Sequence, residues 1–519
     1  MTDIDQTVVL PRPDVAEADE EEARSPDPWE APATGSAPVG GPGNAGAALT
    51  RLAWLLSTLV AAAVGLVRSS WSSLSGDELT TWALANTTWS QLWELRTDID
   101  VLTAPYYALT RAWAEVAGSS EFSLRLPSVL AMAVAAGGVA ALTSRLVSPR
   151  AGVLAGLLFA VLPVTSRYAH EAGPVALSVA FAVLSTAALV RFFERPRFWR
   201  WAGYTGAVAL LGLPHAAALL LLLGHAGAVL ILRRRVLPGW VLAAGLGAAP
   251  AAGLLLVGRP PWDLAPGREP VGVPTVPLAA DTLFGLAVVG GLVVGVGMIG
   301  LSLRRPAGVF TAAALVPLLG LYPAAELTGI GLAELLLFTL PFWACLAATA
   351  LARAPLVRGL VVVAVVGLVG LPVQLDLRTE AGHGLAAREV AAVLAGQVQT
   401  GDAIVYGPGV RDERVGRDLV ARYVPAGARP EDVLALDPPR TGRRLLAREC
   451  VDVAACVGDA PRVWLLRADQ PTSPLDGLPA AKDGLLRVRY ELVRTWPVRG
   501  ASLSLFTLAP GELDRPAPR

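Results

Sequence analysis

Lysine is nearly absent from this sequence of 519 residues, in which Lys482 is the only one and arginine supplies almost all of the positive charge. Lys and Arg together number 43, as do Asp and Glu, so the formal net charge is zero. A chain with no basic domain and no interleaving of basic and aromatic residues lacks the electrostatic footprint of a nucleic-acid-binding protein. We therefore expect no nucleic-acid partner.

Cysteine is also scarce, with three in the whole chain. Cys345 lies inside an apolar run and is expected to be a small core residue. Cys450 and Cys456 lie close together in a polar region, and the sequence leaves open whether they form a disulfide or remain free thiols. The chain lacks a Cys/His spacing typical of structural zinc and a glycine-rich phosphate loop, so it offers no definite cofactor. A divalent cation is left open.

Apolar residues dominate the rest of the composition. They make up 54% of the chain and give a mean hydropathy of +0.52, which predicts a polytopic, all-α membrane protein. On the length criterion of about 20 residues a span, we expect about eleven transmembrane helices. They lie near residues 52–68, 125–146, 151–166, 174–193, 201–214, 216–232, 237–257, 281–301, 309–326, 335–352 and 359–375.

Arginine clusters recur in alternate loops between these runs, so they all fall on one side of the membrane. Positive charge marks the cytoplasmic side, which places the N-terminus inside and, with an odd number of spans, the C-terminal region outside. The clusters are Arg145 with Arg150, Arg191 to Arg200, Arg233 to Arg235, Arg304 with Arg305, and Arg353 with Arg358.

Three regions follow from these patterns. Residues 1–48 are acidic and rich in Pro, Gly and Ala, and we expect a disordered cytoplasmic tail. Residues 49–376 form the transmembrane domain, with a large first outer loop at 69–124. Residues 377–519 contain one helical pattern and several strand patterns, including DAIVYG, PRVWLLR and ASLSLFTL, which indicate a small extracytoplasmic α/β domain.

The first outer loop begins with two adjacent carboxylates, Asp77 and Glu78, directly before a helical pattern. Negative side chains at this position cap and stabilise a helix N-terminus. A carboxylate at the lipid–water boundary can instead act as a general base. Both interpretations remain open at this stage. The segment 98–113, which contains Asp100, Tyr106 and Tyr107, suits a helix lying in the membrane interface.

Further polar residues lie at the outer ends of the predicted spans. Arg125 can bind a phosphate or extend to the lipid headgroups. The short loop at 165–177 holds Arg167, His170 and Glu171, and such crowding of polar groups beside the membrane indicates a function. His215 lies at another outer turn, where a lone histidine is more often structural than a ligand.

The motifs GDE after the first span, DIDVLTAPYYALTRAW, EFSLRLPSVLAMA and SRYAHEAGPVAL together resemble the membrane-embedded glycosyltransferases of the GT-C superfamily. The resemblance is greatest to the actinobacterial, family-39-like branch related to protein mannosyltransferases, and it covers residues 52 to about 375 in layout. It implies a multi-pass protein of the bacterial plasma membrane that uses a polyprenyl-phosphate sugar as donor and acts on the outer face.

The same resemblance implies roles for individual residues. Asp77 would be the catalytic base that activates the acceptor hydroxyl, with Glu78 in support. Asp100, Tyr106 and Tyr107 would line the substrate pocket. Arg125, Arg167 and His170 would neutralise the lipid phosphate as it leaves, and Glu171 and His215 are further candidates for binding the substrate. The expected reaction is an inverting transfer of one sugar, with mannose as the expected sugar and a glycan, glycolipid or protein as acceptor.

Two other classes of function fit an apolar chain with an outer domain. A lipid or sugar transporter would usually carry ionisable groups near the bilayer midplane and internal repeats. This sequence has its charges at the edge and shows no repeat. A non-catalytic membrane scaffold would only display the C-terminal domain. An assay with a labelled polyprenyl-phosphate sugar separates the three hypotheses.

Overall fold

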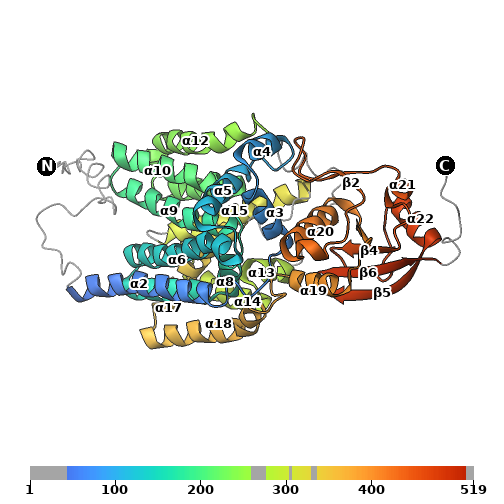
Figure 1. The fold of residues 1–519 in the computed structure, drawn as a ribbon. Coiled ribbons are helices and arrows are strands. Elements are labelled where there is room, and N and C mark those ends of the chain that lie inside the picture. Colours follow the sequence, from blue (N-terminus) through green and yellow to red (C-terminus); the bar gives the residue numbers. More distant parts are fainter. Residues whose placement is uncertain (1–43, 259–275, 303–306, 329–335, 510–519) are drawn as a thin grey trace, which may run out of the picture.

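The computed structural model describes residues 44–258, 276–302, 307–328 and 336–509. An all-helical part forms one end of the molecule, and a smaller part with a sheet forms the other (Figure 1). Most of the predicted acidic tail lies outside the described residues. Its predicted boundary at residue 48 falls within a helix, because α2 already begins at Asn44.

The apolar region is built from helices joined by short connections (Figure 1). They are α2 (Asn44–Leu66), α6 (Glu121–Leu146), α7 (Pro149–Val161), α8 (Pro163–Ala169), α9 (Val175–Glu194), α10 (Phe198–Gly212), η2 (Ala216–Leu220), α11 (Leu221–Leu232), η3 (Arg234–Val236), α12 (Leu237–Leu254), α13 (Val276–Phe284), α14 (Ala287–Gly300), α15 (Gly308–Thr328), η4 (Leu337–Thr339), α17 (Leu340–Leu351) and α18 (Leu356–Asp376).

Each predicted apolar run contains helix, but the expected number of about eleven spans is not confirmed. In the part of the chain that the structure describes, 4 helices are long and apolar enough to cross a membrane. A fifth candidate is the pair α7 and α8, bent by 62° at a break. Other apolar helices are shorter, such as α11 with 12 residues, α14 with 14 and α17 with 12, whereas α2 and α15 have 23 and 21. The 3₁₀ segments η2 and η4 directly precede α11 and α17.

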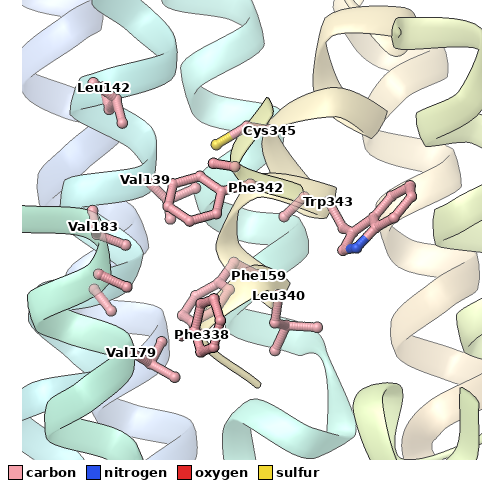
Figure 2. Close-up of a cluster of buried hydrophobic side chains, with 14 of the residues drawn as sticks. Val139, Leu142, Phe159, Val179, Val183, Phe338, Leu340, Phe342, Trp343 and Cys345 are labelled. Atoms are coloured by element: carbon pink, nitrogen blue, oxygen red, sulfur yellow. The ribbon is translucent and has the colours of Figure 1, made fainter. Parts of the chain in front are cut away.

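The core of this region lies where α6, α7, α9 and α17 meet. Figure 2 shows Val139, Phe159, Val183 and Phe342 directed toward one another from these helices. Cys345 lies in the same cluster and is fully buried, which confirms it as a core residue. Its Sγ accepts a hydrogen bond from Thr143 Oγ1 at 3.1 Å.

The first outer loop folds into α3 (Gly76–Ala85), α4 (Trp89–Glu94), η1 (Leu95–Thr97) and α5 (Ala104–Ala117). Ser75 caps α3 and Thr88 caps α4, each through its side-chain oxygen. The sequence predicts a helix within residues 98–113. Helix α5 confirms this prediction, although the helix begins only at Ala104. Pro105 lies in the first turn of α5, where its missing N–H costs nothing.

The C-terminal part is α/β, as predicted. Its elements are α19 (Ala387–Gln397), β1 (Ala403–Tyr406), α20 (Gly409–Tyr423), η5 (Ala426–Ala428), β2 (Ala435–Asp437), β3 (Arg448–Glu449), α21 (Val453–Val457), β4 (Arg462–Arg467), α22 (Ala480–Arg489), β5 (Tyr490–Val498) and β6 (Ala501–Leu508).

The main sheet has the strand order β1-β4-β6-β5. Strands β1 and β4 are parallel, with Ala403 opposite Val463, whereas β4, β6 and β5 are antiparallel neighbours. Both faces of β1 and β4 are buried, which explains their continuous apolar sequence. Cys450 and Cys456 form a disulfide beside this sheet, which decides between the two alternatives left open by the sequence.

The sheet domain packs directly on the first outer loop, and α20 lies beside α3 (Figure 1). Ser73 Oγ donates to the carbonyl of Leu385 at 2.5 Å and accepts from the amide of Ala387 at 3.2 Å. Leu74 and Leu79 share one apolar cluster with Trp464 of β4. The loop that carries the acidic pair therefore lies between the helical bundle and the sheet domain.

Candidate active site

The two adjacent carboxylates of α3 have opposite environments. The side chain of Asp77 is 91% exposed, whereas Glu78 is completely buried. Consecutive residues of a helix point about 100° apart, so one side chain can face the core while its neighbour faces outward. The sequence left capping and catalysis open for this pair, and the structure gives each residue its own surroundings.

Glu78 is held by four N–H donors. Arg125 donates from Nε to Oε1 and from Nη2 to Oε2, both at 2.7 Å. The amide of Ala172 donates to Oε1 at 2.9 Å, and the amide of Ser75 donates to Oε2 at 2.9 Å. Burial alone would raise the pKa of Glu78, but the charge and hydrogen bonds of Arg125 outweigh it and hold this pKa at about 2.

Glu78 therefore completes a capping box with Ser75 and anchors α3 to α6 and to the loop before α9. The capping interpretation from the sequence is confirmed. Support for catalysis from Glu78 can only be indirect, because none of its surface is accessible to a substrate.

Arg125 makes six hydrogen bonds and is fully buried. Besides the two to Glu78, its Nη atoms donate to the carbonyls of Ser69, Ser72 and Ser73 at 2.6 to 3.0 Å and to the Ser72 hydroxyl. A guanidinium has five N–H groups, and these contacts occupy all of them. The prediction that Arg125 binds a phosphate or a lipid headgroup is wrong for this arrangement, because no donor remains.

Asp77 occupies the first turn of α3, and its closest cation comes from the sheet domain. Arg414 of α20 places Nη2 3.5 Å from Oδ1 of Asp77. Tyr107 of α5 lies within electrostatic reach of both residues: burial raises its pKa, Arg414 opposes this shift and Asp77 adds to it. The exposed carboxylate thus lies where α3, α5 and α20 meet.

The other predicted residues of the first loop lie beside this point. Asp100 accepts a hydrogen bond from the amide of Leu102 at 2.9 Å, and burial raises its pKa. Tyr106 is buried, with its ring centroid 5.9 Å from that of Tyr107. Glu171 is close enough to Tyr106 to raise its pKa, after the larger effect of burial. Tyr106 and Glu171, from two segments far apart in the sequence, are therefore within electrostatic reach of each other.

Arg167 lies at the end of α8 and lines a cavity of about 330 Å³. The wall of this cavity is mixed: the aliphatic parts come from α8 and α18, and polar groups come from α13. Its lining residues are Pro163, Arg167, Tyr168, Asp281, Thr282, Gly285, Val373 and Leu377. A cavity whose wall combines aliphatic side chains with a guanidinium can accept an anionic headgroup joined to a hydrocarbon chain.

His170 is buried, and its ring lies 6.4 Å from that of His383, measured between centroids. Burial and the nearby Arg378 lower the pKa of His170 to about 3. Burial also lowers the pKa of His383 to about 4, where Arg125 and Arg167 oppose the effect of Glu78. At neutral pH both rings are uncharged, so His170 does not supply the positive charge that the resemblance implied. A neutral imidazole can still donate a hydrogen bond to a phosphate.

The sequence did not identify His383 or Arg414 as candidate site residues. His383 stands between two glycines after α18, where its link to the loop at 165–177 has no local signal. Arg414 belongs to a helix of the C-terminal domain with an ordinary charged pattern. His215 was predicted but lies apart: in the described part of the chain, no hydrogen bond joins it to another candidate, and its side chain is half-buried before η2.

Metal ligands do not gather at this site. Within residues 44–258, 276–302, 307–328 and 336–509, no three His, Cys, Asp or Glu side chains lie close enough together to hold an ion. The divalent cation left open by the sequence stays untested.

Known proteins show the same architecture. Residues 104–252 match the family model of dolichyl-phosphate-mannose-protein mannosyltransferases. The crystal structure of ArnT from Cupriavidus metallidurans bound to undecaprenyl phosphate superposes with a TM-score of 0.56 at 12% identity, over 87% of this chain and 97% of that chain. The apo state of the same protein gives 0.57 at 14% identity with the same coverage. No curated protein matches the sequence. At these identities the structural likeness shows a shared fold.

Proposed function

We propose that this chain is a membrane glycosyltransferase of the GT-C type, which transfers one sugar from a polyprenyl-phosphate-linked donor to an acceptor hydroxyl outside the plasma membrane. Residues 104–252 match the mannosyltransferase family model, and the fold is similar to that of ArnT. The donor class is supported by the structural match, because the matched ArnT structure has undecaprenyl phosphate bound. Mannose is the proposed sugar, since the matched family description names dolichyl-phosphate-mannose.

The observation that carries this proposal is the exposed carboxylate of Asp77 on a rigid support. Its neighbour Glu78 is tied to Arg125 and Ala172, so the backbone of the first turn of α3 is fixed. Asp77 itself projects outward with its side chain accessible. A general base needs both accessibility to the reacting hydroxyl and a fixed position.

The proposed reaction is a single displacement. Asp77 accepts the proton of the acceptor hydroxyl, the hydroxyl oxygen bonds to the anomeric carbon, and the bond from that carbon to the phosphate oxygen breaks. The leaving group is the polyprenyl phosphate, which departs with the electron pair of that bond. One base and no carboxylate nucleophile imply inversion at the anomeric carbon.

Arg167 is the proposed cation for the donor phosphate. It lines the cavity of about 330 Å³, where the side chains of Pro163, Val373 and Leu377 can contact the first part of a polyprenyl chain. A guanidinium that compensates the growing charge on a departing phosphate stabilises the transition state. Neutral His170 and His383 can donate further hydrogen bonds, because the Nε2 atoms of both lack a partner among the described residues.

The test compares two carboxylate variants in the same outer loop. Asp77→Asn removes the proposed base. Glu94→Gln makes the same chemical change on α4, where the side chain is exposed and has no proposed role. Each variant is purified, placed in liposomes and incubated with a radiolabelled polyprenyl-phosphate mannose and membrane acceptors. Labelled glucose and arabinose donors are run in parallel to identify the sugar.

We expect Asp77→Asn to lose transfer by on the order of 100-fold or more, with Glu94→Gln equal to the wild type. Asp77→Asn with wild-type transfer would remove the base assignment. A folded wild-type protein that transfers none of these sugars, but moves the labelled lipid across the bilayer, would instead favour the transporter.

A further inference from the structure

The sheet domain packs closely against the first turn of α3. A Cβ atom built on Gly76 would lie 3.0 Å from Cγ2 of Val415 in α20. That distance is shorter than a normal contact, so α20 touches the backbone of α3 where the acidic pair begins. Arg414, the residue before Val415, is thereby placed next to Asp77.

Helix α20 is also anchored at its other end. The hydroxyl of Tyr423 accepts from the amide of Leu74 at 2.8 Å and donates to Glu121 at 3.1 Å. Arg422 and Arg388 both pair with Glu121, at 3.1 and 3.3 Å. These contacts join the sheet domain to the residues just before α3 and to the start of α6. The position of Arg414 relative to Asp77 is therefore fixed by contacts at two points along α20.

Two other carboxylates lie near Arg414. Asp418 accepts a hydrogen bond from Arg440 at 2.7 Å and also feels the charge of Arg414, and Glu413 is paired with Arg417 at 2.6 Å. The Nε of Arg414 is buried without a hydrogen-bond partner among the described residues. Its Nη2 faces Asp77. Exposed ion pairs add little to stability, so this contact has more value for orienting the carboxylate than for holding the domains together.

We propose that Arg414 is a positioning residue for Asp77, so that the sheet domain supplies part of the active site. In the absence of an acceptor, Arg414 holds the carboxylate near α20. When the acceptor hydroxyl enters, Asp77 keeps one oxygen toward Arg414 and offers the other to the hydroxyl. This inference rests on the proposed function of Asp77 as base.

The proposal also explains why the sheet domain is joined so closely to the first outer loop. A domain that only displayed a binding surface would need no contact with α3. Here three residues within four positions of Asp77 each contact the sheet domain, namely Ser73, Leu74 and Gly76. A catalytic group must keep its geometry to within a fraction of an ångström, and this arrangement supplies that restraint.

The experiment measures kcat and KM for the donor in full-length protein carrying Arg414→Gln, Arg414→Lys or Arg414→Met. Asp77→Asn is included to test the base itself. Arg487→Gln is the matched control, because Arg487 also forms a simple exposed pair, with Asp483 at 2.8 Å, on α22 of the same domain. The thermal midpoint of each variant is measured alongside.

We expect Arg414→Gln and Arg414→Met to lower kcat roughly ten- to a hundredfold, with the donor KM unchanged. Arg414→Lys should recover part of kcat, because it restores the positive charge without the planar fork. Arg487→Gln should equal the wild type. A merely structural role would lower the thermal midpoint and would give no difference between folded Lys and Met variants.

The outcomes separate the inference from the proposed function. If Asp77→Asn is inactive and Arg414→Gln has wild-type kcat, the inference is overturned while the function stands. If Asp77→Asn is active, the base assignment fails and the inference fails with it. If Arg414→Gln does not fold, equal kcat in the Lys and Met variants overturns the inference. A change confined to the donor KM also overturns it, since Arg414 would then bind the donor.

Discussion

Replacing Arg125 by methionine should destabilise the protein strongly. Methionine has a similar volume and no charge, so the change removes the cation while filling much of the space. Glu78 would remain fully buried without its counter-charge. The carbonyls of Ser69 and Ser73 would also lose a donor. Removing one partner of a buried ion pair costs about 3–5 kcal/mol, and we expect a value in that range.

The chain contains a suitable reporter for this measurement. Cys345 is fully buried in the helical bundle, whereas Cys450 and Cys456 are joined in a disulfide. A thiol-reactive fluorophore therefore labels Cys345 only when the bundle opens. A loss of about 4 kcal/mol should lower the midpoint of labelling by on the order of 10 °C. Arg125→Lys should fall between methionine and wild type, because an ammonium cannot reproduce the bidentate contact.

A control variant and a double variant test whether Arg125 stabilises the buried charge of Glu78. Arg145 lies on α6, the helix that also carries Arg125, and forms an exposed ion pair with Glu194 of α9. Arg145→Met breaks this pair and should cost less than about 1 kcal/mol. The double variant Glu78→Gln with Arg125→Met should be more stable than the sum of the single changes predicts, because it removes both charges. If Arg125→Met melts like Arg145→Met but no longer binds the donor lipid, the residue is a phosphate ligand and the structural role is wrong.

Two further predictions concern stability. Gly500→Ala should destabilise the sheet domain by about 1–3 kcal/mol, because Gly500 has a φ of +78° and an added Cβ would overlap the carbonyl of Gly384. The control is Gly484→Ala, at an open position of α22, which should be neutral or stabilising. Equal thermal midpoints for the two variants would contradict the steric argument. The thermal midpoint should fall as the pH drops below 6.5, since the pKa of His170 is lowered from 6.5 to about 3 and the unfolded state gains its proton first. Below pH 4.5 the fall should steepen as the stabilisation from Glu78, whose pKa is lowered to about 2, is lost. A midpoint that is constant from pH 7 to pH 4.5 would contradict the assignment of His170, and a fall that does not steepen below pH 4.5 would contradict that of Glu78.

The sequence was most informative where local chemistry decides the structure. Runs of apolar residues predicted the helices of the bundle, and the strand patterns predicted β1, β4 and β6. Capping was an open alternative for the acidic pair, and the structure shows it through Glu78, which completes a capping box with Ser75. The expected number of about eleven spans is not confirmed, because 4 helices in the described part of the chain are long and apolar enough to cross a membrane.

The site was less predictable, because its contacts join residues far apart in the chain. Arg125 and Glu78 are 47 positions apart, and nothing local indicates that the guanidinium turns toward the acidic pair. The sequence identified His170 and predicted that its ring carries a positive charge. Burial and neighbouring cations remove this charge and keep the ring neutral. Arg414 and His383 come from the C-terminal part, so they join the site only through the docking of the two domains.

The opposite environments of Asp77 and Glu78 affect how activity data on this protein should be interpreted. A Glu78 variant will lose transfer even though the side chain never meets the substrate, because it disconnects α3 from Arg125 and so displaces Asp77. Such a loss should be accompanied by a lower thermal midpoint and should become smaller as the temperature is reduced. Loss of a base at the exposed Asp77 should leave the midpoint unchanged and persist at every temperature. Activity alone therefore cannot assign the base within an adjacent carboxylate pair, whereas activity and stability measured together can.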